Sequence, residues 1–305
     1  MPSKTRSWRA PGRVNIIGEH IDYLGGTVLP FACDLELVVE ASPRPDSVVK
    51  FSSPDASPDP YVRGVVQALE ENGIESFGCE GTITSSIPVG AGLSSSAAVT
   101  AGIALAVSNG AKLTPSLLQR AEILASGVRG GLMDQTSVLE GKAGHALLLD
   151  CATGTFDHVD IPEEIAFVVI DTGTRRELAD GRYAQRKTEA ESGHPKRRLH
   201  TDSEQRRVFD AVDALRAGDV ASLGALVSAS HASLSDNFEV SSEALDAAVR
   251  RAESHPRCHG ARLVGAGFAG CVLAVVEKGS EDEVAAMFER TYPVRAVDGA
   301  GPIEA

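Results

Sequence analysis

The stretch that decides the fold is residues 88–98, whose sequence is Pro-Val-Gly-Ala-Gly-Leu-Ser-Ser-Ser-Ala-Ala. It is small and uncharged, and an apolar, alanine-rich run follows it over residues 99–107. Glycine and serine let backbone N–H groups turn toward one point. A helix that begins at the serines adds its unpaired N–H groups and the positive end of its dipole. The pattern is typical of a phosphate cradle. A serine-capped helix after a glycine turn accounts for the same residues, so the rest of the chain must decide.

The residues around this stretch predict a mixture of helices and strands. Residues 81–87 form a predicted strand that runs directly into the stretch, which gives the order strand, glycine-rich loop, helix. Helical spacing and capping signals predict helices over residues 61–71, 115–126, 133–139, 205–216, 220–234, 243–254 and 281–290. Apolar, β-branched runs predict strands over residues 14–18, 27–29, 35–40, 145–150, 166–171 and 294–297, and residues 261–276 are β-rich but broken by glycines. No βα unit repeats, so the predicted fold class is α+β.

Two polar segments interrupt this pattern. Residues 42–60 contain five prolines separated by serine and aspartate, which predicts a loop or an irregular edge. Residues 175–199 are strongly charged and predict an exposed helix with loops. We expect the domain boundary between these segments, with one domain over residues 1–162 and a second over residues 163–305.

The composition excludes several classes of protein. With 305 residues, 43% of them apolar, the chain can bury a large core in one or two domains. Acids outnumber bases 42 to 29, and the net charge of −13 argues against nucleic acid or an anionic membrane as a partner. The five cysteines form no Cys-X-X-Cys pair, which argues against a disulfide framework or a zinc site. No secretory signal or membrane-spanning apolar run is found, so we expect a cytoplasmic protein.

Four chemically useful side chains lie close together beside the first predicted strand, namely Arg13, Glu19, His20 and Asp22. A carboxylate accepts hydrogen bonds from two neighbouring hydroxyls, so acids at a pocket rim suit a polyol such as a sugar. Arg13 can pair with an acid or face phosphate oxygens. A surface turn with ordinary ion pairs is the alternative interpretation.

A second candidate follows a glycine turn. Gly131 is followed by Leu, Met and Asp134, at the start of a predicted helix whose dipole favours an ionised carboxylate. Asp134 could accept a proton from a hydroxyl nucleophile. A helix N-cap is the simpler role for an aspartate in this pattern.

A third glycine-rich segment matches Gly-X-Gly-X-X-Gly over residues 265–270. A dinucleotide site needs a helix after those glycines, whereas residues 271–276 predict a strand. We interpret the segment as a glycine loop between two strands that approaches something closely, with the partner left open.

Several separated segments together resemble one family. Residues 10–23, with sequence Ala-Pro-Gly-Arg-Val-Asn-Ile-Ile-Gly-Glu-His-Ile-Asp-Tyr, closely resemble the galactokinase signature. Residues 88–98 look like the second motif of the wider GHMP kinase superfamily, and residues 264–270 resemble its third. Residues 121–122 with 131–135, and residues 230–241, are also similar to galactokinase segments. The resemblance therefore spans residues 10–276.

This resemblance implies an α+β, two-domain GHMP kinase fold, with a ribosomal S5 domain 2-like N-terminal domain and a ferredoxin-like C-terminal domain. It implies an enzyme that uses ATP to phosphorylate the anomeric C1 hydroxyl of galactose. Asp134 and Arg13 would be catalytic. The sugar-binding residues would be Arg13, Glu19, His20, Asp22, Gly131, Asp134 and Tyr183. The ATP phosphates would lie on Gly90, Ala91, Gly92, Leu93, Ser94, Ser95, Ser96 and Ala97, and Mg²⁺ would be held by Ser96 and Glu122.

Departures from the family pattern leave the sugar open. The chain is shorter than typical galactokinases in residues 42–60 and 192–204, and Ile21 replaces the usual threonine. Arg176 follows Arg175 where galactokinases commonly carry a histidine. An extra guanidinium near the sugar would suit a uronic acid, because arginine pairs well with carboxylate. We therefore weigh galactose against galacturonate, arabinose and fucose, with a solvent-facing Arg176 as the simpler interpretation.

A non-catalytic sugar and nucleotide sensor is the alternative from another class. Such relatives lose small residues in the phosphate loop, whereas residues 95–98 are all small in this chain and Asp134 is present. Mevalonate and homoserine kinases share the loop but not the Glu-His-Ile-Asp segment. The expected ligands are therefore a monosaccharide and ATP with Mg²⁺. We expect the protein itself to be a monomer or a weak homodimer.

Overall fold

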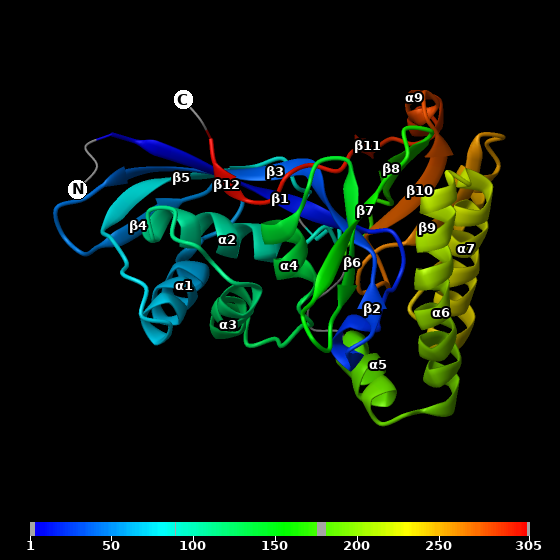
Figure 1. The fold of residues 1–305 in the computed structure, drawn as a ribbon, viewed down its shortest axis with the longest axis horizontal. Coiled ribbons are helices and arrows are strands. Elements are labelled where there is room, and N and C mark those ends of the chain that lie inside the picture. Colours follow the sequence, from blue (N-terminus) through cyan, green and yellow to red (C-terminus); the bar gives the residue numbers. More distant parts are fainter. Residues whose placement is uncertain (1–3, 89, 176–180, 304–305) are drawn as a thin grey trace.

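Three β-sheets organise the described part of the chain (Figure 1). The computed structural model describes residues 4–88, 90–175 and 181–303. The five-stranded sheet has the order β12-β1-β3-β5-β4, with bounds Gly301–Pro302, Arg6–Asn15, Pro30–Pro43, Cys79–Ser85 and Val49–Ser52. The four-stranded sheet has the order β11-β8-β10-β9, with bounds Thr291–Val294, Ile165–Asp171, Cys271–Glu277 and Cys258–Leu263. The three-stranded sheet has the order β2-β6-β7, with bounds Thr27–Val28, His145–Asp150 and Phe156–Asp160.

The helices form two groups around these sheets (Figure 1). In the first group, α2 and α4 pack on β1 and β3, and α1 and α3 pack on each other. Its bounds are α1 Asp59–Glu71, α2 Ser95–Val107, α3 Pro115–Ser126 and α4 Met133–Glu140. In the second group, α7 and α8 pack on β9 and β10, and α6 packs on α7. Its bounds are α5 Arg182–Glu191, α6 Pro195–Ala217, α7 Val220–Ser233, α8 Glu243–Glu253 and α9 Glu281–Ala285.

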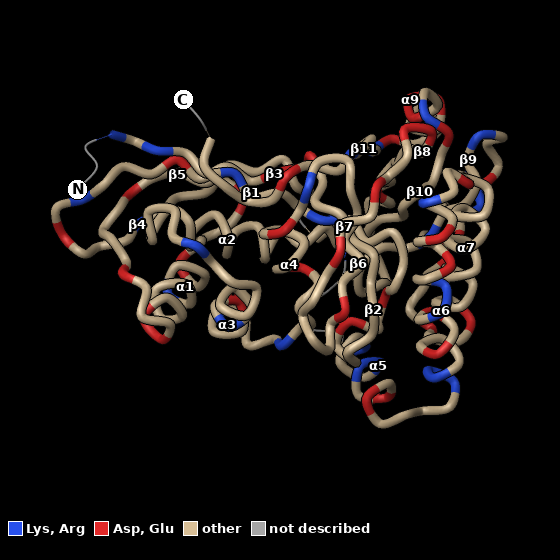
Figure 2. Tube along the Cα trace, viewed as in Figure 1, with Lys and Arg blue, Asp and Glu red and all other residues tan. Residues whose placement is uncertain are grey.

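The α+β class predicted from the sequence is confirmed, and the two polar segments contribute an edge strand and parts of two helices. Strand β4 lies inside the proline-rich segment 42–60 and pairs in parallel with β5. The prolines flank this strand without interrupting it, so they do not prevent pairing. The charged segment 175–199 contributes α5 and the first turns of α6, along which both signs of charge are interspersed (Figure 2).

Helix α2 has the position predicted from the serines. Ten of its 13 residues are buried, because small side chains let it pack between the five-stranded sheet and α1 and α3. Its N-cap residue, Ser94, has a left-handed backbone with φ of 58° and makes no side-chain capping hydrogen bond. The simple interpretation of this stretch as a serine-capped helix is therefore wrong for Ser94, and its hydroxyl is left for another partner.

The C-terminal end of the described chain returns to the N-terminal sheet. Strand β12 pairs with β1, with Trp8 opposite Pro302. Before it, Val297 N donates to Ala32 O and Ala300 N donates to Val138 O. We keep the division between residues 162 and 163 as a proposal, with the segment from about residue 296 crossing back to the first half.

Close packing of α1 on α3 depends on a glycine. A methyl group at Gly64 would lie 2.3 Å from the carbonyl oxygen of Ala121, which no real contact allows. Alanine is a better helix former than glycine by about 1 kcal/mol, but that preference is overridden where the helix backbones touch.

We therefore expect Gly64→Ala to lower the free energy of unfolding by about 1–3 kcal/mol, measured by urea denaturation. The control is Arg63→Ala, an exposed position on the same helix, which should change stability by less than about 0.5 kcal/mol. A Gly64→Ala variant as stable as the unchanged chain would contradict this close approach.

Candidate active site

An ion pair between Arg13 and Asp134 lies at the centre of the candidate site. Arg13 is a buried residue near the end of β1, and Asp134 lies in the first turn of α4. Nε and Nη2 of Arg13 each lie 2.8 Å from Oδ1 of Asp134. Nη1 of Arg13 donates to the carbonyl oxygen of Gly92 over 2.5 Å. One guanidinium therefore joins the predicted catalytic carboxylate to the glycine-rich loop.

Burial lowers the pKa of Arg13, but the charges of Asp134, Glu19 and Asp22 outweigh it and raise the pKa above its ordinary value. The guanidinium therefore stays charged. Among the described residues, Arg13 is the only cationic side chain in contact with Asp134. It supplies the counter-charge that lets several carboxylates gather in one place.

Asp22 lies against Gly131 across the site. A methyl group on Gly131 would lie 2.2 Å from Oδ2 of Asp22, so a side chain there would displace the Asp22 carboxylate. Burial raises the pKa of Asp22 to about 6, and the charges of Asp134 and Glu19 add to the rise. The structure therefore brings Asp22, Gly131 and Asp134 together, as the sugar-pocket prediction requires.

His20 packs in an aromatic cluster beside these acids. Its ring lies 4.6 Å from the Phe238 ring and 6.0 Å from the Tyr183 ring, between centroids. Burial lowers the pKa of His20 to about 3, so the imidazole is neutral. Among the described residues Nε2 has no partner with hydrogen-bond geometry, although the Ala266 backbone is close enough to affect the pKa. A neutral imidazole suits a sugar hydroxyl better than a charged group.

Glu19 is fixed by a residue that the sequence did not single out for the site. Its Oε1 accepts from Gly265 N over 2.9 Å and from Nη2 of Arg262 over 3.1 Å. Arg262 is fully buried in β9 and also donates to the carbonyl oxygens of Ile16 and Asn15. Glu19 is therefore bound to the third glycine-rich segment, and only part of its carboxylate is left to meet a sugar.

The phosphate loop supplies open backbone at the start of α2. Gly90 and Gly92 have left-handed φ values of 73° and 79°. The Ser94 hydroxyl is buried without a hydrogen-bond partner in the described part of the chain. An unpartnered buried hydroxyl beside a helix N-terminus fits a phosphate oxygen as its missing partner. Residue 89 of the same stretch lies outside the described residues.

The third glycine-rich segment packs on this loop, which is the partner that the sequence left open. It connects β9 to β10, so the strand expected after the glycines is present. A methyl group at Gly92 would lie 3.0 Å from the Val264 carbonyl oxygen, and one at Gly270 would lie 3.5 Å from that of Ala91. The two glycine-rich segments therefore support each other.

Glu122 and Ser96 lie together beside this loop. Gln135 donates to Oε2 of Glu122 over 2.6 Å. The pKa of Glu122 is raised above its ordinary value, mainly by burial and also by the charge of Asp134. A hydrogen bond from the Ser96 hydroxyl opposes this rise. No group of three or more His, Cys, Asp or Glu positioned for a metal occurs among the described residues. A hydroxyl and one carboxylate fit Mg²⁺, which takes oxygen ligands and usually keeps waters and substrate phosphates.

Arg175 lies just after β8 and pairs with an acid of that strand. It forms a two-pronged ion pair with Asp171, with both N–O distances 2.8 Å, at the end of β8. Its Cδ lies 3.5 Å from where a methyl group on Gly90 would be, so it borders the phosphate loop. The extra guanidinium that the sequence suggested near the sugar was that of Arg176, so the position of Arg175 does not test that hypothesis. Arg176 lies outside the described residues.

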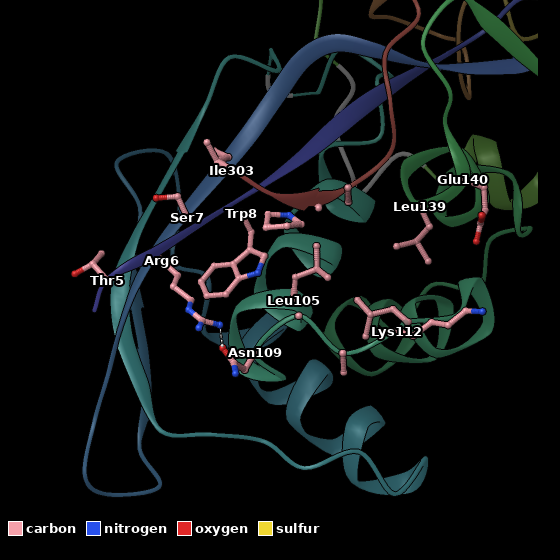
Figure 3. Close-up of a pocket in the computed structure, with 16 residues that line it drawn as sticks. Thr5, Arg6, Ser7, Trp8, Leu105, Asn109, Lys112, Leu139, Glu140 and Ile303 are labelled. Carbon is pink, nitrogen blue, oxygen red and sulfur yellow. Dashed lines mark hydrogen bonds between the residues drawn. The ribbon is translucent and has the colours of Figure 1, made fainter. Parts of the chain in front are cut away.

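A surface cavity of about 690 Å³ lies elsewhere in the molecule (Figure 3). It is lined by residues around Trp8, Asn109 and Ile303, between the start of β1, the end of α2 and β12. None of the predicted site residues lines this cavity, so it is not the candidate active site.

The structure also reveals site residues that the sequence did not assign. Arg262 is a charged residue in an otherwise apolar strand, which was the one visible signal. His200 and Glu204 are spaced four residues apart on α6, so they share a helix face, but the surrounding charged sequence hid them.

Three family models match the chain. They are the galactokinase galactose-binding signature over residues 2–43, the GHMP kinases N terminal domain over residues 60–142 and the GHMP kinases C terminal over residues 211–294. The mevalonate kinase of Methanococcus jannaschii has the same fold, with a TM-score of 0.78 at 20% identity over 98% of this chain and all of that chain. The fold is therefore that of a two-domain GHMP kinase.

Individual relatives narrow the class to one family. The galactokinase of Roseiflexus sp. is 36% identical over 97% of this chain and 92% of its own length. That of Pyrococcus furiosus is 33% identical over 93% and 92%. The structure of Lactococcus lactis galactokinase complexed with galactose matches with a TM-score of 0.90 at 26% identity, over 98% of this chain and 95% of that chain. This chain belongs to the galactokinase family, which confirms the resemblance found in the sequence.

The raised pKa of Asp22 predicts a pH-dependent cost to stability. In an unfolded chain an aspartate has a pKa of about 3.9, whereas that of folded Asp22 is about 6. Folding therefore disfavours the charged form above pH 6, and the cost disappears as pH falls toward 4.

We expect Asp22→Asn to raise the free energy of unfolding at pH 8 by about 1–3 kcal/mol, while weakening sugar binding. Urea denaturation should show the gain shrinking as pH falls from 8 to 5. A gain that is the same at both pH values would contradict a buried charge as its cause.

Proposed function

We propose that this chain is an enzyme that transfers the γ-phosphoryl group of ATP to the anomeric C1 hydroxyl of galactose, which yields galactose 1-phosphate and ADP. Membership of the galactokinase family supports the reaction. The observation that carries the proposal in this chain is the position of Arg13, which contacts Asp134 on one side and Gly92 on the other. It joins a group that can receive a proton to the loop that would hold the donor phosphates.

Asp134 and Arg13 would carry the chemistry. Phosphoryl transfer passes through a loose transition state, so positioning and charge neutralisation matter more than a strong base. Asp134 would orient the sugar C1 hydroxyl and accept its proton late in the transfer. Arg13 would keep the carboxylate ionised and face the phosphoryl group as charge develops on it.

The sugar would lie between the loop after β1 and the start of α4. Asp22, as a carboxylate with Gly131 behind it, would accept hydrogen bonds from two adjacent hydroxyls. Neutral His20 would bond a third, with the Tyr183 ring 6.0 Å from its own ring, between centroids. Glu19 would contribute mainly by holding the third glycine-rich segment, because Arg262 and Gly265 already occupy one of its oxygens.

ATP would be bound through the phosphate loop, residues 90–97, with Ser94 supplying its unpartnered hydroxyl. Ser96 and Glu122 would hold Mg²⁺, oriented by the hydrogen bond from Gln135 to Glu122. When bound, the metal neutralises charge on the donor phosphates.

We further expect a cytoplasmic monomer or weak homodimer. Among the described residues no helix combines the length and apolar character needed to cross a membrane.

Two alternatives have less support. Galacturonate was suggested by a second guanidinium at Arg176, which lies outside the described residues, whereas the galactose-binding signature matched by residues 2–43 favours galactose. A non-catalytic sensor is opposed by the intact pair of Arg13 and Asp134.

The test is turnover of a sugar panel with ATP and Mg²⁺, followed by release of ADP. We expect kcat/KM to be highest for galactose, above those for galacturonate, arabinose and fucose. Asp134→Asn should lower kcat by about 10²–10⁴-fold, because an amide cannot accept the proton, while ATP affinity changes little. Turnover of galacturonate with galactose inert would overturn the substrate, and undiminished kcat in Asp134→Asn would overturn the mechanism.

The metal assignment predicts a separate effect. Glu122→Gln removes an anionic oxygen ligand, so the Mg²⁺ concentration for half-maximal rate should rise about tenfold. The control is Glu70→Gln, an exposed acid on α1, which should leave the Mg²⁺ titration unchanged. Equal titrations for both variants would show that Glu122 does not hold the metal.

A further inference from the structure

Helix α6 contacts the backbone of the predicted sugar-binding loop at three points. The loop runs from Gly18 to Thr27, between β1 and β2, and α6 lies beside β2 (Figure 1). Glu204 Oε1 accepts from Gly18 N over 2.9 Å. His200 Nε2 lies 3.0 Å from the carbonyl oxygen of Glu19. Gln205 Oε1 accepts from Thr27 N over 2.9 Å. These contacts bridge 178–186 residues of sequence.

The loop needs this external support because its backbone is not regular. Gly18 has a φ of 105°, where a side chain is strained, and a methyl group there would lie 3.2 Å from Val208 on α6. His20 has a left-handed φ of 63° although it carries a side chain. Such conformations persist only where the surrounding structure holds them. Buried N–H and C=O groups at these points need partners, and α6 provides them.

Glu204 is the strongest of the three supports. It is fully buried, and Oε1 also accepts from the Ser230 hydroxyl over 2.7 Å. Its other oxygen pairs with Arg207, with Nε at 2.8 Å and Nη2 at 2.7 Å. Burial raises the pKa of Glu204, but His200, Arg207 and Arg262 outweigh burial and lower it. The carboxylate is therefore ionised, and its bond to Gly18 N is charge-assisted.

We propose that Glu204, supported by His200 and Gln205, is a positioning residue that sets the backbone of residues 18–20 for sugar binding. This inference rests on the proposed galactokinase function, and none of the three residues touches the substrate. The next two residues after Gly18 are Glu19 and His20, so a shift of Gly18 moves both predicted sugar-pocket residues. The phosphate loop is held directly by Arg13 and by the segment 264–270, which is anchored between the paired strands β9 and β10 and, among the described residues, bonds Glu19 only through Gly265 N. Loss of Glu204 should therefore weaken sugar binding and spare ATP binding.

The decisive comparison is Glu204→Leu with Glu204→Gln. Both variants lose the pairing with Arg207, but leucine also leaves Gly18 N and the Ser230 hydroxyl unpaired, whereas glutamine retains an acceptor oxygen for these two donors. We expect Glu204→Leu to raise KM for galactose by about tenfold or more, with KM for ATP within about twofold. Glu204→Gln should raise KM for galactose by about threefold or less.

A second variant guards against loss of folding in Glu204→Leu. Gln205 is half-buried, and Gln205→Ala removes the acceptor for Thr27 N without leaving a buried charge unpaired. It should raise KM for galactose by a few-fold and leave that for ATP unchanged. The stability control is Asp219→Ala, which removes the N-cap hydrogen bond to Ser222 N on α7 and touches no part of the loop. It should alter the melting temperature but neither KM.

Calorimetric titration with galactose, without ATP, separates this inference from the proposed function. An unchanged chain that phosphorylates no galactose overturns the proposed function. The positioning role alone is overturned if the wild-type protein phosphorylates galactose and both Glu204→Leu and Gln205→Ala bind galactose with wild-type affinity. Equal increases in both KM values, or effects that follow the melting temperature as in Asp219→Ala, would also overturn it. Failure of both variants to fold while Glu204→Gln folds would make the contacts structural and reject the proposal.

Discussion

The fully buried guanidinium of Arg262 is the interaction on which the arrangement of the site depends. It reaches from β9 in the four-stranded sheet to the end of β1 in the five-stranded sheet, where it donates to two backbone carbonyls and to Glu19. A buried charge without partners is strongly disfavoured, so these groups must come together for the chain to fold. Their meeting brings the loop after β1, the phosphate loop and the segment 264–270 to one place. Fold and site are therefore specified by the same contacts.

Carboxylates gather in the site against their electrostatic preference. Asp22, Asp134 and Glu19 are close enough to alter one another's surroundings, and Arg13 with Arg262 offsets only part of the repulsion. The pKa of Asp22 is raised first by burial and then by the repulsion that remains. A polyol has many hydroxyl donors, so the proposed sugar would give these acids further hydrogen bonds. This gathering of acids opposes stability and suits the proposed sugar, which is the usual relation between stability and function in an active site.

Local sequence predicted the elements better than it predicted the contacts between them. The glycine-serine stretch, the strand before it and the helix at Pro115–Ser126 were correct because turns, caps and apolar spacing act over a few residues. The family motifs then supplied candidate residues, and the structure brings Arg13, Asp22, Gly131 and Asp134 together. The sequence could not reveal Glu204 as a partner of Gly18, because 186 residues separate them and the pairing depends on how α6 packs. Nor could it show that Arg175 turns toward Asp171, since side-chain direction follows from tertiary packing.

The pairing of β12 with β1 has a consequence for the order in which the chain can fold. β1 is the first strand of the described chain and β12 is the last, with Trp8 opposite Pro302. During synthesis the N-terminal sheet can form around β1, β3 and β5 long before residue 301 exists. The outer edge of β1 at Trp8 then stays unpaired while the C-terminal half of the chain is synthesised. During that time its free backbone N–H and C=O groups are exposed to pairing with another strand. The sheet that carries Arg13 is thus the first to begin and the last to be finished.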